Sequence, residues 1–153
     1  MEIERKFVLD RLPDDLDGHP HRRIEQGYVA IDPLGTEVRL RRTDDERTLT
    51  VKAGAGLVRV EEGLALGAAD FDALWPLTRD RRIVKTRYRV PLDDGLIAEV
   101  DIYEGALEGL LVAEVEFDDE AASKAFAPPD WLGREVTGDD RYANRELAVR
   151  GLP

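Results

Sequence analysis

Apolar and polar residues alternate along much of this chain, and a period of two residues is what β-strands with unlike faces produce. In the opening segment MEIERKFVLD, Glu2, Glu4 and Lys6 would lie on one face of a strand and Ile3 and Phe7 on the other. The same alternation predicts strands at residues 2–8, 23–31, 37–43, 48–53, 57–66, 83–90, 96–103 and 111–117. A mainly β (α+β) fold follows, with one domain over residues 1–153. Eight strands in this length predict an antiparallel barrel or tunnel that is closed or nearly closed.

Three segments depart from the alternation and predict short helices that flank the barrel. The first, at residues 68–77, carries Phe71 and Leu74 at helical spacing. The others are predicted at residues 120–127 and 139–147. Amphipathic helices need an apolar surface to cover, and the outside of a barrel would supply one.

Alternate positions of the predicted strands give one charged face and one apolar face. The charged face carries Glu2, Glu4, Lys6, Glu37, Arg39, Arg41, Lys52, Arg59, Glu61, Lys85, Arg87, Arg89, Glu99, Asp101, Glu114 and Glu116. Alternation alone favours the ordinary arrangement, in which the apolar face is the core and the charged face meets water. The helices favour the reverse arrangement, and so does the sorting of charges by strand.

Acids dominate the first strand and the last two, whereas bases dominate the third, fourth and sixth. Closing the sheet would pair the first strand with the last and would gather the acids opposite the bases. Crowded carboxylates repel one another, and a divalent cation reverses that cost because it needs several oxygen ligands. Arginine and lysine bind phosphate oxygens. The pattern therefore predicts a metal–polyphosphate site inside a water-filled tunnel, since a dry interior could not hold these charges.

Composition narrows the classes of partner. A net charge of −11 argues against nonspecific binding to nucleic acid or to an anionic membrane. We expect a cytoplasmic protein, because no apolar run of membrane-spanning length and no signal peptide is visible. The chain lacks cysteine, and its two histidines, His19 and His21, are expected in a loop. A metal would then be held by oxygen, which suits Mg²⁺ or Mn²⁺.

The ordered set of motifs resembles the CYTH superfamily, also called triphosphate tunnel metalloenzymes, and most of all its small single-domain bacterial branch. The E-x-E-x-K pattern of EIERK is followed by EQGYVA, EVRLRR, TVKAG, RVE, RIVKTRYRV, AEVDIYEGALEGLLVAEVEF and WLGREVTGDDRYANRELA. The resemblance implies an eight-stranded tunnel, open at both ends, that hydrolyses a triphosphate with Mg²⁺ or Mn²⁺. Inorganic triphosphate, cleaved to pyrophosphate and phosphate, is the expected substrate.

The resemblance also implies roles by position. The implied metal ligands are Glu2, Glu4, Glu61, Asp101, Glu114 and Glu116. The implied phosphate-binding residues are Lys6, Arg39, Arg41, Lys52, Arg59, Lys85 and Arg87. Lys6, Glu4, Glu114 and Tyr28 would be catalytic, with Tyr28 either assisting Lys6 near the leaving group or only packing in the barrel.

Some positions stay open. Asp101 and Glu99 would bind metal through water or orient other groups, and Gly63 replaces the usual second acid of the fifth-strand motif. Arg141 and Tyr142 match the part of the family's tail that closes one tunnel end, which favours a structural role.

Three alternatives to inorganic triphosphate hydrolysis remain. A class IV-type adenylate cyclase or a thiamine triphosphatase could use the same tunnel, and a non-catalytic module could bind a nucleotide or polyphosphate there. An ordinary barrel with a solvent-facing charged sheet is the fourth reading. The large apolar strand face also predicts a possible homodimer through the barrel exterior.

Overall fold

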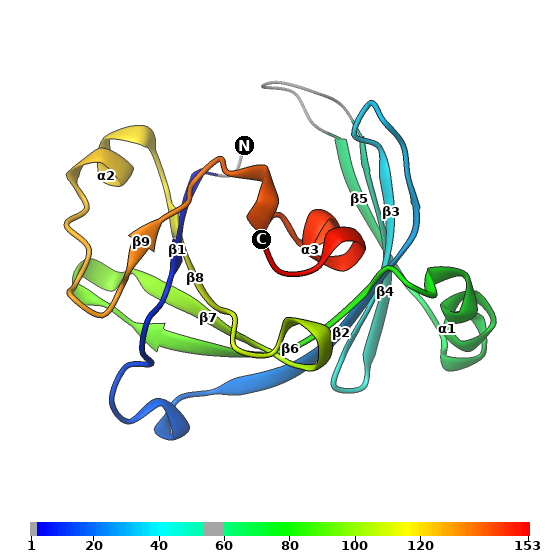
Figure 1. Cartoon of the computed structure of the whole chain (residues 1–153), viewed down its shortest axis with the longest axis horizontal. Helices are drawn as coiled ribbons and strands as arrows, with labels where there is room; N and C mark the ends of the chain where they lie inside the picture. Colours follow the sequence, from blue (N-terminus) through cyan, green and yellow to red (C-terminus); the bar gives the residue numbers. More distant parts are fainter. Residues whose placement is uncertain (1–2, 54–59) are drawn as a thin grey trace.

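The computed structural model describes residues 3–53 and 60–153, and in these ranges it shows one curved antiparallel sheet of nine strands (Figure 1). The strands are β1 (Ile3–Val8), β2 (His21–Ile31), β3 (Glu37–Thr43), β4 (Glu46–Ala53), β5 (Val60–Ala65), β6 (Arg82–Pro91), β7 (Ile97–Tyr103), β8 (Leu111–Phe117) and β9 (Arg134–Glu135). Their hydrogen-bonded order is β5-β4-β3-β2-β6-β7-β8-β1-β9. The predicted pairing of the first strand with the last long strand is confirmed, with Lys6 opposite Glu114.

The prediction of an eight-stranded barrel that is closed or nearly closed is only partly matched, because the sheet has nine strands and its two end strands, β5 and β9, do not pair with each other. In a closed barrel, the outer edge of β1 would pair with β5. Residues 134–137 occupy that edge instead. Glu135 pairs with Phe7, and the Val136 N–H donates to the Lys6 carbonyl at 2.8 Å. A ninth strand of two residues is too short to show an alternating pattern, so the sequence did not reveal it.

The sheet bends into two facing walls. In Figure 1, β3, β4 and β5 form one wall, β7, β8 and β1 form the other, and β2 and β6 connect them. A β-bulge in β2 shifts the register between Tyr28 and Ala30. Bulges bend a strand and increase its twist, so this one contributes to the curvature next to a predicted site residue.

The convex face is apolar, and two of the three helices pack on parts of it as predicted, whereas the third, expected at residues 139–147 as another flanking helix, lies on the concave side. The helices are α1 (Ala68–Leu74), α2 (Glu120–Ala125) and α3 (Asn144–Arg150), and the 3-10 turns are η1 (Leu16–Gly18), η2 (Trp75–Thr78), η3 (Asp93–Gly95), η4 (Gly105–Leu107) and η5 (Asp140–Tyr142). Phe71 of α1 is buried, and the Arg42 guanidinium lies 5.7 Å from its ring centroid. Phe126, just after α2, packs on the core that contains Val115 and Phe117. No helix in the described ranges is long and apolar enough to cross a membrane.

The concave face is charged at one end and apolar at the other. In β8 the inward row runs from Glu116 through Glu114 to Val112, which is buried. The C-terminal segment with η5 and α3 lies in the concavity (Figure 1), where Tyr142 and Leu147 pack in one core with Val112. The C-terminal segment therefore closes one end of the concave face.

Gly133 should be needed for the pairing of β9 with β1. A Cβ at this position would lie 2.2 Å from the Val8 carbonyl oxygen, which belongs to the backbone and cannot rotate away. We expect Gly133→Ala to lower the free energy of unfolding by about 1–3 kcal/mol in urea denaturation.

Gly18→Ala is the control for this substitution, because a Cβ there would meet no atom within 4 Å. Equal stability of the two variants would show that β9 does not depend on the close approach at Gly133.

Candidate active site

Inward-facing side chains from both walls line a cavity of about 270 Å³ in the concave face. The lining residues are Glu4, Lys6, Tyr28, Glu37, Arg39, Arg41, Lys52, Glu61, Arg87, Glu99, Glu114, Glu116, Ala143, Asn144 and Arg145. Arg41, Arg87 and Glu99 also line a second cavity, of about 280 Å³, toward His21. The predicted inward face thus surrounds an internal space, with acids mainly on β1, β7 and β8 and bases mainly on β3, β4 and β6.

The acidic wall brings carboxyl groups into direct contact. Glu4 is opposite Glu116 in the β1–β8 pairing, and Glu114 is opposite Glu99 in the β7–β8 pairing. The side chains of Glu4 and Glu114 share a hydrogen bond, and the Lys6 ammonium lies 3.7 Å from Glu114. Burial acts to raise the pKa of Glu114, but Lys6 and the bond with Glu4 outweigh it and lower this pKa. Two carboxyls this close need a shared proton or a cation between them.

This donor set fits a hard divalent cation that completes its shell with other oxygens. Within residues 3–53 and 60–153, no three His, Asp or Glu side chains form a complete metal-binding group. Magnesium is commonly held by one or two carboxylates together with water and substrate phosphates. Glu4 and Glu114 could supply such a pair, with Glu116 beside them; Glu2 lies outside the described residues.

The opposite wall crowds cations together. Arg41 donates from Nε to Gln26 Oε1 at 2.7 Å, and its pKa is lowered to about 10 by burial and by the charges of Arg39 and Arg87. The buried Nε of Arg39 has no hydrogen-bond partner in the described part of the chain. An unpaired guanidinium N–H among mutually repelling cations is suited to bind an anion.

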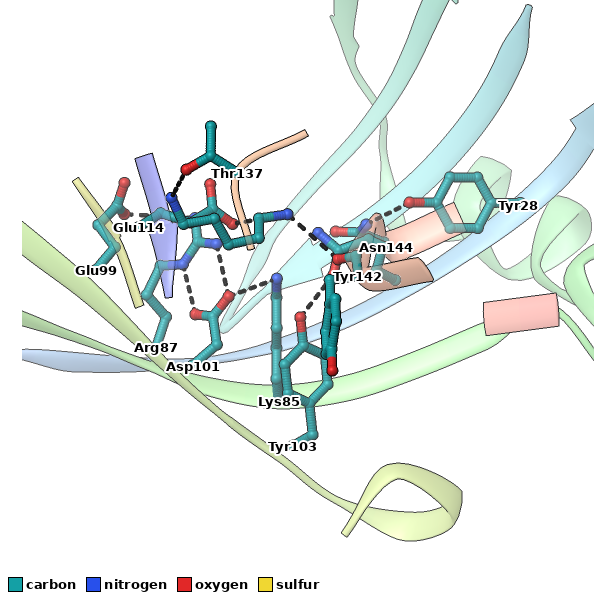
Figure 2. A network of polar contacts seen from close by, with 12 residues as sticks. Tyr28, Lys85, Arg87, Glu99, Asp101, Tyr103, Glu114, Thr137, Tyr142 and Asn144 are labelled. Carbon is teal, nitrogen blue, oxygen red and sulfur yellow. Dashed lines mark hydrogen bonds and ion pairs between the residues drawn. The ribbon is translucent and has the colours of Figure 1, made fainter. Parts of the chain in front are cut away.

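A buried ion cluster lies beneath this charged surface (Figure 2). Asp101, 1% exposed, accepts from Lys85 Nζ at 2.8 Å and from Arg87 Nε and Nη2 at 2.8 and 2.9 Å. Burial acts to raise the pKa of Asp101, but Lys85 and Arg87 outweigh it and lower this pKa to about 2. Both Asp101 oxygens are thus engaged by protein cations, and neither Asp101 nor Lys85 lines the cavity.

Tyr28 and Lys6 both line the cavity. The buried Tyr28 hydroxyl accepts from Gln26 Nε2 at 2.8 Å, and burial together with the Glu37 charge raises the pKa of Tyr28 to about 12. The tyrosine therefore stays protonated and can donate a hydrogen bond into the cavity. Lys6 Nζ donates to the Tyr142 carbonyl at 3.2 Å.

The C-terminal segment contributes cavity residues that the sequence did not single out, namely Ala143, Asn144 and Arg145. No strand alternation marks them, although they fall within the tail motif DDRYAN and the residues after it. Tyr142 itself is buried and its hydroxyl accepts from Arg134 Nη2 at 2.9 Å, which agrees with a structural role.

The fifth strand places one of its two predicted site residues in the cavity. Glu61 lines it and lies 3.8 Å from Lys52 Nζ, whereas Arg59 lies outside the described residues. A Cβ on Gly63 would lie 3.6 Å from Thr50 Oγ1, an ordinary contact, so space alone does not require glycine there.

Comparisons with known proteins point to one family. The chain is 44% identical over 149 residues to an inorganic triphosphatase from Nitrosomonas europaea, covering 97% of each chain. It is 37% identical over 150 residues to an inorganic triphosphatase from Acetivibrio thermocellus, covering 95% of this chain and 92% of that one. A crystal structure of an inorganic triphosphatase matches with a TM-score of 0.81 and 38% identity, over 100% of this chain and 97% of that one.

More distant structures share the fold. A protein from Hippeastrum, described as having a dominant triphosphatase activity, matches with a TM-score of 0.57 and 17% identity over 81% of this chain and 83% of that one. No protein-family profile matches the chain. The fold and the charged cavity are those of a triphosphate tunnel protein. The chain belongs to the CYTH superfamily, in the small single-domain branch that includes the inorganic triphosphatases.

Asp101 should be essential for stability because it neutralises Lys85, whose side chain has no exposed surface, and also pairs with Arg87. We expect Asp101→Ala to lower the free energy of unfolding at pH 7 by about 3–5 kcal/mol, since Lys85 would be left buried without its partner. Urea denaturation measures this loss.

The double variant Asp101→Leu/Lys85→Met should regain much of this stability, because it removes both buried charges together. Glu146→Ala, which breaks a surface pair with Arg150, is the control and should cost less than about 1 kcal/mol. A loss at Asp101 no larger than the control's would refute the role of the cluster.

Proposed function

We propose that this protein is a divalent-metal-dependent triphosphatase that hydrolyses inorganic triphosphate to pyrophosphate and phosphate. The observation that carries the proposal is a cavity with a carboxylate wall facing an arginine wall. Its lining is charged nearly throughout, which matches a substrate that is charged along its whole length. The similarity to two inorganic triphosphatases supports the same substrate.

Glu4 and Glu114, with Glu116 and Glu2 as further candidates, would hold Mg²⁺ or Mn²⁺. The bound ion would supply charge neutralisation at phosphate oxygens and activation of water. Glu61 faces the cavity from the opposite wall, where Lys52 is its nearest described cation. We therefore assign Glu61 to the orientation of Lys52 in preference to metal binding.

Arg39, Arg41, Lys52 and Arg87 would bind the triphosphate oxygens, and Arg59 is a further candidate. Their charges would stabilise the negative charge that spreads over the terminal phosphoryl group as water attacks in line. Binding of the anion would also oppose the burial and the charge repulsion that together lower the pKa of Arg41.

Departure of pyrophosphate needs a donor at the bridging oxygen. Lys6 and Tyr28 both line the cavity, and the raised pKa of Tyr28 keeps its hydroxyl protonated. We assign these two residues to stabilise the leaving group by hydrogen bonding.

Lys85 and Asp101 receive positioning roles in this proposal. Asp101 holds Arg87 through two hydrogen bonds to its guanidinium, and Lys85 supplies the second charge that keeps Asp101 ionised. Arg87 then presents its remaining donors to the cavity without rotating away, which lowers the entropic cost of binding substrate.

A nucleoside triphosphate is the second candidate substrate, and one observation favours it. The second cavity adjoins the first through Arg41 and Arg87, and His21 on its wall packs against the Tyr88 ring in a tilted arrangement with 4.8 Å between ring centroids. A base or another organic group could enter there while the phosphates remain between the charged walls.

The proposal also includes a cytoplasmic location and no nucleic-acid partner, which rest on the sequence and on the net charge of −11. We also propose that two copies of the chain could form a homodimer through their convex faces.

Removing either close carboxylate should abolish metal-dependent turnover. We expect Glu4→Gln and Glu114→Gln to reduce kcat for inorganic triphosphate by about 100-fold or more, because the amide is a poor ligand for a hard cation. Phosphate release in a titration of Mg²⁺ and Mn²⁺ measures this effect.

Glu120→Gln, on the exposed surface of α2, is the matched control and should behave as wild type. Near-normal turnover in both active-site variants would remove these carboxylates from the mechanism.

The charged lining of the cavity should favour inorganic triphosphate over triphosphates that carry an organic group. We expect inorganic triphosphate to be hydrolysed about tenfold or more faster than ATP or thiamine triphosphate, because the cavity lining offers few apolar contacts. Chromatography of the products would distinguish pyrophosphate release from formation of cyclic AMP. Tight triphosphate binding without turnover in either metal would instead establish a binding module.

A further inference from the structure

Arg145 reaches the active-site cavity from the C-terminal segment and not from the sheet. It is the second residue of α3, which lies in the concavity between the two walls (Figure 1). The phosphate-binding candidates Arg39, Arg41 and Arg87 all belong to strands. A ligand held by these strands would therefore meet a different donor on the side that faces α3.

The backbone around Arg145 is fixed by its neighbours. The Tyr103 hydroxyl donates to Asn144 Oδ1 at 2.7 Å (Figure 2), and Leu147 is only 2% exposed within the core. Two residues before Asn144, the Tyr142 carbonyl accepts a hydrogen bond from Lys6 Nζ. The start of α3 is thus held against β1 and β7, so Arg145 has a defined position at the cavity.

The side chain of Arg145, in contrast, has a weakly held ion pair. Its Nη2 lies 4.0 Å from Asp140 Oδ1, and the Asp140 side chain is 87% exposed. Exposed pairs at this distance contribute little to stability. The guanidinium can exchange Asp140 for a stronger anion at little cost.

The other arginines of this segment are committed elsewhere. Arg141 makes two hydrogen bonds to Asp139, at 3.0 and 2.6 Å, and Arg150 donates to Glu146 at 2.7 Å. Neither lines the cavity. Among the cations of α3, Arg145 alone combines a place in the cavity lining with a long ion pair.

We propose that Arg145 is a substrate-binding residue that leaves Asp140 and binds phosphate oxygens of the triphosphate from the α3 side of the cavity. A triphosphate chain carries oxygens around its whole circumference, and a planar guanidinium can bind two of them at once. The identity of the ligand rests on the proposed function, but the placement of Arg145 does not.

Arg145→Met tests the proposal, because it keeps most of the side-chain length and removes the charge. With inorganic triphosphate, we expect kcat/KM to fall about tenfold or more, mainly through a higher KM, while the urea midpoint stays unchanged. Arg145→Lys should recover part of the loss, because lysine restores the charge but not the two-pronged geometry.

Arg150→Met is the matched control on the same helix and should leave kcat and KM at their wild-type values. Calorimetric titration with triphosphate in the absence of metal gives a second readout, in which Arg145→Met should bind about tenfold more weakly. Wild-type kinetics and affinity in Arg145→Met would overturn the inference while leaving the proposed function intact.

Failure of wild-type protein to hydrolyse triphosphate would overturn the proposed function instead. The binding comparison would then still decide whether Arg145 contacts the anion.

Discussion

The carboxylate of Asp101 is the point at which the buried part of the sheet joins its charged surface. One anion neutralises Lys85, which has no exposed surface, and fixes Arg87, which faces the cavity. A buried ion pair of this kind is seldom the most stable choice, since well-packed apolar residues often do as well or better. We explain its presence by its position, because the two hydrogen bonds from Asp101 fix the Arg87 guanidinium at the wall of the cavity.

Elsewhere in the cavity, side chains of like charge lie close together, and the protein alone does not neutralise them. Arg41 is crowded by Arg39 and Arg87, and Glu4 shares a hydrogen bond with Glu114 on the opposite wall. A cation between the carboxylates and an anion between the arginines would reduce both costs together. Ligands that bind only the folded state stabilise it by mass action. Binding of the metal and the triphosphate, which catalysis requires, would therefore also stabilise the folded protein.

Much of this could be predicted from the sequence, because alternation identifies which side chains share a face. It located the long strands, the pairing of β1 with β8 and the inward direction of residues such as Glu114 and Arg39. Alternation does not show how deeply each side chain on a face is buried or what pairs with the edge of a strand. It could not show that Lys85 and Asp101 lie beneath the cavity surface, or that residues 134–137 occupy the free edge of β1.

The C-terminal segment supplies the side of the cavity that the open sheet leaves without a strand. With the outer edge of β1 occupied by β9, the sheet does not close against β5, and a cavity bounded by strands alone would lack one side. The segment that supplies β9 continues into η5 and α3, whose first residues line that cavity. The apolar ends of β6, β7 and β8 are needed for this, because Ile83, Tyr103 and Val112 give α3 a surface on which to pack. Each inward row of those strands thus does two things: its charged half faces the ligand, and its apolar half anchors the segment that completes the wall around it.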